Sequence, residues 1–191
     1  MDVAQELKKL LLREPRRTLA VAESITCGHL QARIGAISGA SEFFLGGITA
    51  YTLEEKVKHL GVKRAAAKAV NSVSAEVAEQ MALGACALFG SDFALATTGY
   101  AEPFDLAQGG PFDGEPSRTA QGGPSAEGRM AAPFAWWALA HAQGSRSGGG
   151  RNFFVRSGRI DGSGVARVAM QEYVAERTLA ELVNYLRGRR A

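Results

Sequence analysis

Two segments of the chain end in residue types that can carry out acyl transfer. Ser24 follows the apolar run 18–23, and Tyr51 and Lys56 stand at the end of, and just beyond, the β-rich segment 46–52. A serine hydroxyl is a weak nucleophile near neutral pH and needs a base. A lysine whose pKa is lowered by desolvation can take the serine proton. If the two segments are neighbouring strands, Tyr51 and Lys56 meet Ser24 at one edge of a sheet.

The same residues also have structural interpretations. Ser24 stands where a strand passes into a helix, so its Oγ can act as the helix N-cap and accept from the N–H of Cys27. Lys56 can equally be a solvated helix residue. The chain has three histidines, the usual bases for a serine nucleophile: His29, His59 and His141. No companion aspartate suggests a triad with any of them, so lysine is the alternative base.

A third strand end adds Thr98 and Gly99, in the run TTGYAEP. Ligands of α/β sheets bind beyond the carboxyl ends of the strands, so three such ends predict one cleft. The N–H groups of Thr26, Cys27 and Gly28 belong to the turn after the first strand. They can stabilise a developing oxyanion if this turn opens a helix.

Hydrophobic periodicity indicates the elements that would position these residues. Helices are expected over 5–13, 26–36, 53–60, 74–89 and 165–186. Strands are expected over 18–23, 46–52, 92–98, 134–141 and 152–156, the last two as a hairpin. Helices alternate with strands early and two strands pair late, which favours an α/β fold with a mixed sheet and helices on both faces.

Composition limits the classes of function. The chain has 191 residues, of which 46% are hydrophobic, and this predicts one globular domain over 1–191. Its net charge of +3 is too small to predict a nucleic-acid partner. The two cysteines, Cys27 and Cys86, have neither CxxC nor zinc-site spacing, which favours a reducing compartment. The first twenty residues lack a secretory pattern and no 18 apolar residues run together, so we expect a cytoplasmic protein without a membrane partner.

The segment after residue 99 differs in composition from the rest. Between 99 and 150 lie 11 of the 23 glycines and 5 of the 6 prolines. The sequence AQGGP at 107–111 recurs at 120–124. One recurrence without an apolar face does not make a solenoid, so we expect a low-complexity loop inserted over 104–129.

Three motifs resemble a known family. AESITCG, at 22–28, resembles the AES-x-T-G-G signature of the CinA C-terminal family, the nicotinamide-nucleotide amidohydrolases. SGASEFFLGGITAYTLEEKVKHLGV, at 38–62, and VNSVSAEVAEQMALGACALFGSDFALATTGYAEP, at 70–103, resemble the motifs that follow in that family. The similarity covers about residues 3–103 in unbroken order and, more loosely, 134–187.

The resemblance implies a fold, an activity and residue roles. The fold is a three-layer α/β/α sandwich with a mixed, mainly parallel sheet, and the reaction converts nicotinamide mononucleotide and water to nicotinate mononucleotide and ammonia. The nucleophile falls on Ser24, the general base on Lys56 and the active-site tyrosine on Tyr51. Substrate-binding positions fall on Thr26, Cys27, Gly28, Thr98 and Gly99. No metal and no cofactor are expected in this mechanism.

The chain departs from the family pattern around the expected site. The changed positions are Cys27, Leu53, Tyr100, Glu102 and the run 162–164, where Gly-Ser-Gly stands in place of Gly-Asp-Arg. Glu102 would repel a phosphate. The arginine of that run is absent, and Arg159 and Arg167 are the candidates to replace it.

Two functional hypotheses follow. The first is a Ser-Lys amidohydrolase acting on nicotinamide mononucleotide or a related amide. The second is a catalytically weakened relative that binds a nucleotide-like ligand or acts as an assembly partner. In both, a small nucleotide-like molecule is the expected partner, and the chain is expected to form a homo-oligomer.

Overall fold

A five-stranded mixed sheet forms the centre of the molecule. A computed structural model describes residues 3–105, 130–144, 152–162 and 166–189. The strands are β1 (Leu19–Glu23), β2 (Phe44–Thr49), β3 (Phe93–Tyr100), β6 (Phe134–Gln143) and β7 (Asn152–Asp161). Their order in the sheet is β2-β1-β3-β6-β7. The first three strands are parallel, while β6 and β7 run antiparallel as a hairpin.

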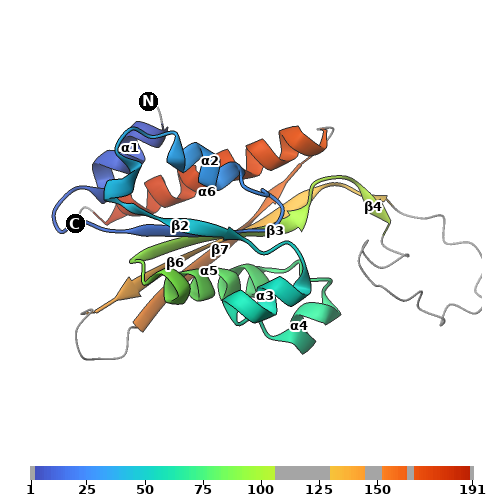
Figure 1. Cartoon of the computed structure of the whole chain (residues 1–191). Coiled ribbons are helices and arrows are strands. Elements are labelled where there is room, and N and C mark those ends of the chain that lie inside the picture. The colour runs from blue at the N-terminus through green and yellow to red at the C-terminus, as the bar shows by residue number, and fades with distance from the viewer. Residues whose placement is uncertain (1–2, 106–129, 145–151, 163–165, 190–191) are drawn as a thin grey trace, which may run out of the picture.

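Helices cover both faces of this sheet (Figure 1). One face carries α1 (Val3–Leu11), α2 (His29–Gly35) and α6 (Arg167–Gly188). The other carries α3 (Leu53–Leu60), α4 (Arg64–Ala69) and α5 (Ala75–Phe89). The three-layer α/β/α architecture and the mixed sheet are therefore confirmed.

The central strands are buried on both faces, but with side chains of different size. Large residues such as Val21 and Leu95 point into the core beneath α1, α2 and α6. Ala22, Ala94 and Ala96 point to the opposite core, where the helix α5 packs. Small side chains on that face let the helix axis approach the sheet closely, because side-chain size sets the distance between packed layers.

Local capping fixes where the helices on the α5 face begin. The hydroxyl of Ser74 accepts from the N–H of Val77 at 3.1 Å, and that of Thr52 accepts from the N–H of Glu55 at 3.4 Å. Gly90 ends α5 with a φ of 65°, a left-handed conformation that glycine adopts without strain. The Thr52 cap starts the helix that carries Lys56 shortly after β2.

The sequence predicted most of these elements but missed helix α4, the 3-10 turn Ala40–Glu42 and the short strands Phe104–Asp105 and Met130–Ala131. Helix α4 was not predicted, because only Ala67 of its six residues is buried and no amphipathic period results. The strands β6 and β7 extend further than predicted, to ten residues each. No helix within the described residues is long and apolar enough to cross a membrane.

The predicted insertion over 104–129 lies mostly outside the described residues, which stop at 105 and resume at 130. Its two flanks are described. The pair β4 (Phe104–Asp105) and β5 (Met130–Ala131) forms a short antiparallel ladder. The two ends of the segment therefore leave the domain side by side.

Candidate active site

Ser24 and Lys56 are in direct contact at the carboxyl edge of the parallel strands. Ser24 follows β1, and its backbone N–H donates to the carbonyl of Thr97 in β3 at 3.0 Å. The Lys56 Nζ lies 2.9 Å from the Ser24 Oγ and also donates to the carbonyl of Tyr51 at 2.9 Å. The contact predicted from the two strand ends is confirmed.

Burial changes the acid–base behaviour of Lys56. Its side chain is only 2% exposed. Within the described chain, no carboxylate pairs with its ammonium, and the two hydrogen bonds above go to neutral oxygens. Desolvation lowers the pKa of Lys56 from 10.5 to about 8. At pH 7 about a tenth of the molecules therefore hold a neutral amine beside the serine. Such an amine can accept a proton from Ser24.

Gly28 occupies the N-cap position of α2 and the Glu23 side chain caps the helix, so the interpretation of Ser24 as an N-cap is wrong. The fully buried Glu23 carboxylate accepts from the N–H groups of Gly28, Leu30 and Gln31 at 2.9, 3.0 and 2.9 Å. A negative charge at a helix N-terminus is favourable because it meets the positive end of the helix dipole. The Ser24 hydroxyl is left to interact with Lys56.

The turn between Ser24 and α2 passes through two left-handed residues. Cys27 has a φ of 46° and Gly28 a φ of 101°. The first conformation costs a side-chain-bearing residue roughly 1 kcal/mol, which explains why a glycine suits this position. Cys27 is exposed at the rim of the site. The Gly28 N–H is bonded to Glu23, so only N–H groups earlier in the turn remain candidates for an oxyanion.

The two predicted threonines connect the loops around the site. Thr26 Oγ1 lies 2.7 Å from Thr97 Oγ1, and both side chains are buried. Thr98 Oγ1 donates to the carbonyl of Ser72 at 2.7 Å. A Cβ on Gly99 would meet the carbonyl oxygen of Phe134 at 2.4 Å, so this glycine permits the close approach of β6. The structure brings these residues to the predicted edge, where they hold the surrounding segments together.

A turn at Asn71 and Ser72, which was not predicted, also borders the site. Asn71 and Ser72 have φ values of 49° and 60°. The Asn71 amide donates to the Tyr100 hydroxyl at 2.9 Å, which joins this turn to the end of β3. The Tyr100 ring also packs edge-on against Phe134, with centroids 5.7 Å apart. An Asn-Ser pair is a known turn signal, but its partner Tyr100 is distant in sequence.

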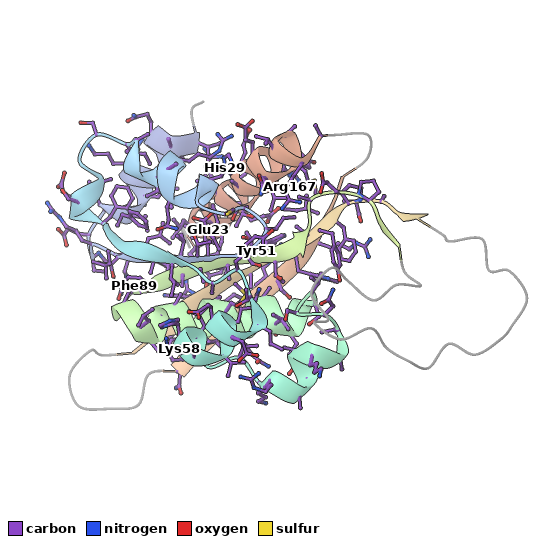
Figure 2. All side chains as sticks on the ribbon, turned by 45° about the vertical axis from the view of Figure 1, so that its right-hand side comes forward. Glu23, His29, Tyr51, Lys58, Phe89 and Arg167 are labelled. Carbon is purple, nitrogen blue, oxygen red and sulfur yellow. The ribbon has the colours of Figure 1, made fainter. Side chains whose placement is uncertain are left out.

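Arg167 lies next to Tyr51 (Figure 2) and forms an ion pair with Glu102. Arg167, the first residue of α6, donates to the Tyr51 hydroxyl through Nη2 and to Glu102 Oε2 through Nη1, both at 2.9 Å. Hydrogen bonding to Glu102 raises the pKa of Arg167 above its usual value. Arg159, the other candidate to replace the missing arginine, pairs instead with Asp161 at 2.7 Å. Of these two arginines, Arg167 is the one that contacts Tyr51.

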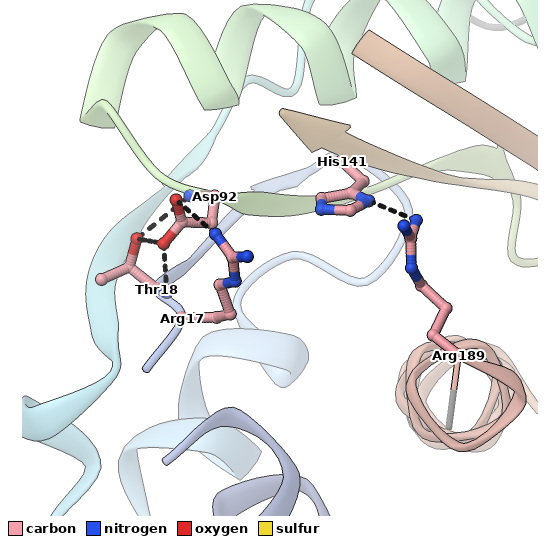
Figure 3. Close-up of polar contacts among 5 residues, drawn as sticks. All are labelled: Arg17, Thr18, Asp92, His141 and Arg189. Atoms are coloured by element: carbon pink, nitrogen blue, oxygen red, sulfur yellow. Dashed lines mark hydrogen bonds and ion pairs between the residues drawn. The ribbon is translucent and has the colours of Figure 1, made fainter. Parts of the chain in front are cut away.

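Neither His59 nor His141 offers a base for Ser24. His59 pairs with Glu55 at 2.9 Å. His141 on β6 is in register with Phe93 on β3. Phe93 lies four residues, or roughly 13 Å, along β3 from Thr97, whose carbonyl accepts from the Ser24 N–H. Figure 3 shows His141 there beside Arg189, in the neighbourhood of Asp92 and Arg17. Burial lowers its pKa to about 4. Among the described residues, no group of three or more His, Cys, Asp or Glu side chains could hold a metal ion.

Comparison with known proteins places the chain in a family. The sequence profile of the CinA C-terminal domain matches residues 1–112, more than half of the chain. The chain belongs to the CinA C-terminal domain family. A CinA-like protein of Picosynechococcus sp. is 50% identical over 93 residues, 49% of this chain and 22% of that protein. A CinA-like protein of Chlorobium chlorochromatii is 46% identical over 103 residues, 54% of this chain and 24% of that protein. The chain thus spans about a quarter of these curated relatives.

Solved structures extend the likeness to the late part of the chain. The competence damage-inducible protein A of Klebsiella pneumoniae has a TM-score of 0.72 and 26% identity, covering 96% of this chain and 94% of that one. A competence or damage-inducible protein of Enterobacter asburiae has a TM-score of 0.71 and 26% identity, covering 97% and 99%. The late hairpin and α6 therefore belong to the CinA fold, although the sequence profile stops at 112.

Proposed function

We propose that this CinA-family protein is an amidohydrolase with a Ser-Lys mechanism. Its substrate would be nicotinamide mononucleotide or a related carboxamide, and its products the corresponding acid and ammonia. The observation that carries the proposal is the 2.9 Å contact between Ser24 Oγ and a buried Lys56 whose pKa lies at about 8. A buried amine without a carboxylate partner is costly to the fold and useful for proton transfer.

In the first half-reaction, neutral Lys56 takes the proton from the Ser24 hydroxyl, and the oxygen attacks the carboxamide carbon. The negative charge moves to the carbonyl oxygen, where N–H groups of the turn after Ser24 can donate to it. Lys56 then gives its proton to the departing nitrogen. Ammonia leaves, and an acyl ester on Ser24 remains.

In the second half-reaction, Lys56 is neutral again and takes a proton from water. The resulting hydroxide attacks the ester carbon, and Lys56 returns the proton to the Ser24 oxygen. The acid product leaves with the enzyme restored. The backbone carbonyl of Tyr51 holds Nζ in place throughout, because it accepts one of its hydrogen bonds at 2.9 Å.

One observation favours the second candidate function, a catalytically weakened relative that binds a nucleotide-like ligand or acts as an assembly partner. The family glycine at position 27 is a cysteine with a φ of 46°, so a side chain stands where backbone would approach a ligand. In that case the Ser24–Lys56 contact would persist without turnover.

Ammonia release from nicotinamide mononucleotide and nicotinamide riboside tests the proposal. We expect Ser24→Ala and Lys56→Ala to lose at least about a thousandfold in kcat, because each removes a member of a unit whose losses do not add. The matched controls are Ser41→Ala and Lys58→Ala, which alter exposed residues, the second on the same helix (Figure 2). Equal activity of Ser24→Ala and the wild type would exclude the mechanism, and inactivity of the wild type on both amides would favour the second candidate.

A further inference from the structure

The ion pair beside Tyr51 joins three separate parts of the chain. Glu102 follows β3, Arg167 opens α6 and Tyr51 follows β2. Both terminal nitrogens of the Arg167 guanidinium donate hydrogen bonds, Nη1 to Glu102 Oε2 and Nη2 to the Tyr51 hydroxyl, each at 2.9 Å. Such an arrangement over sequence separations of 65 and 116 residues fixes the arginine in one place.

Tyr51 connects this pair to the nucleophile. Its backbone carbonyl binds Lys56 Nζ, which contacts Ser24, and its phenol binds Arg167. The Arg167–Glu102 pair therefore lies one tyrosine away from the reacting hydroxyl, at the same edge of the sheet. A substrate with its carbonyl at Ser24 can place its far end against this pair by extending along Tyr51.

The pair is open to a ligand but offers no net positive charge. The side chains of Arg167 and Glu102 are 45% and 57% exposed. A phosphate monoester carries a charge of about −1.5 to −2 at pH 7, and it would have to displace the Glu102 carboxylate or lie beside it. Arg159 does not compensate, because Asp161 neutralises it at 2.7 Å. The outer end of the site thus disfavours a phosphate.

A neutral hydroxyl group, unlike a phosphate, is not repelled by the Glu102 carboxylate and can donate a hydrogen bond to it. A carboxylate can accept several hydrogen bonds. Within the described residues, the Glu102 carboxylate accepts a side-chain hydrogen bond only from Arg167, at Oε2. Carboxylates bind the hydroxyls of ribose in this way in other nucleotide sites. The same pair therefore suits a sugar hydroxyl.

We propose that Glu102 is a specificity-determining residue that selects an unphosphorylated, hydroxyl-bearing carboxamide, a nucleoside amide, over its 5′-phosphate. It does so by holding the Arg167 guanidinium and by repelling a phosphate. The inference rests on the proposed amidohydrolase function, because it names the substrate class of that same site.

The kinetic test compares kcat/KM for nicotinamide riboside and nicotinamide mononucleotide. We expect the wild type to prefer the riboside, and Glu102→Gln to shift the ratio toward the mononucleotide by about fivefold or more, mainly through KM, since one repulsion is removed and one guanidinium released. The shift should shrink at high salt and vanish in the double variant Glu102→Gln/Arg167→Gln. The control Glu42→Gln removes an exposed carboxylate that contacts Arg16 at the other end of β2, and it should leave the ratio unchanged.

A binding test separates this inference from the proposed function. Calorimetry with the products, nicotinate riboside and nicotinate mononucleotide, needs no turnover. A shift in relative affinity of about fivefold in Glu102→Gln, without turnover in any protein, would support the selective role and reject the amidohydrolase. Turnover with identical ratios in wild type and Glu102→Gln would overturn the role of Glu102 and leave the amidohydrolase standing. Failure of both proteins to bind either product would overturn the inference as well.

Discussion

Lys56→Met removes a buried ammonium while keeping most of the side-chain volume. The variant therefore separates the effect of Lys56 on the free energy of unfolding from its effect on activity. Burial lowers the Lys56 pKa from 10.5 to about 8. At about 1.4 kcal/mol per unit, the folded state pays about 3 kcal/mol to keep the charged form below pH 8. Methionine avoids this cost but leaves the Tyr51 carbonyl without its Lys56 hydrogen bond, a loss of about 1–3 kcal/mol. We expect Lys56→Met to be between equally stable and about 2 kcal/mol more stable than wild type at pH 7, with activity lost.

The pH dependence gives the same prediction a second measurement. Between pH 8 and 10.5 the unfolded chain binds more protons at Lys56 than the folded chain, so the free energy of unfolding contributed by this group rises with pH. From pH 7 to pH 10 the wild type should gain about 2–3 kcal/mol relative to Lys56→Met. Urea unfolding at both pH values measures this difference, and Lys58→Met, on the exposed side of the same helix, should show no relative change.

Either of two results would contradict this prediction for Lys56. A loss of several kcal/mol in Lys56→Met at pH 7 would mean that the lysine holds the fold together and is not retained for chemistry. Parallel stability profiles for wild type and Lys56→Met between pH 7 and 10 would mean that the amine is not desolvated as its 2% exposure indicates.

Three further outcomes follow from the same geometry. The value of kcat/KM should rise with pH and level off above about 8, the pKa of Lys56, because only the neutral amine accepts the serine proton; a flat profile from pH 6 to 9 would speak against that base. Glu23→Gln should cost about 1–3 kcal/mol in urea unfolding, since a buried carboxylate that accepts three N–H groups is lost, and an unchanged midpoint would reject its capping role. Gly99→Ala should cost about 1–3 kcal/mol, because the new Cβ would meet a carbonyl oxygen at 2.4 Å. Gly35→Ala, with nothing within 4 Å, is its control and should cost less than about 0.5 kcal/mol.

The strand ends were predictable because their signals are local. Ser24 and Lys56 each follow a short apolar or β-rich run, and parallel strands bring their carboxyl ends to one edge. The family motifs added the expectation that Ser24 is the nucleophile and Lys56 the general base of an amidohydrolase. The 2.9 Å contact confirms the placement, while the catalytic roles stay predictions.

The cap at α2 was missed because two residues compete for it in the sequence. Serine is a residue type that favours N-cap positions, whereas the sequence pattern predicts Glu23 as the last residue of a strand. What decides between them is the left-handed turn at Cys27 and Gly28, which directs three N–H groups toward the buried carboxylate. Backbone conformation of this kind is not visible in residue types alone.

The outer part of the site depends on distant partners. Glu102 and Arg167 are 65 residues apart and are separated by the segment 106–129, which the structure does not describe. The sequence offered Arg159 and Arg167 as equal candidates, and only the position of α6 beside Tyr51 distinguishes them. Asp161 accounts for the other arginine by a contact two residues away.

The proposed mechanism passes through an acyl ester on Ser24, and hydroxylamine would capture this intermediate. The measurement is the product formed from nicotinamide riboside or nicotinamide mononucleotide when hydroxylamine is added to the reaction at pH 8. We expect the wild type to form the hydroxamate at the expense of the acid, with ammonia release continuing, and Ser24→Ala to form neither product. Ammonia release with only the acid as product, or hydroxamate formation by Ser24→Ala at the wild-type rate, would contradict a serine nucleophile.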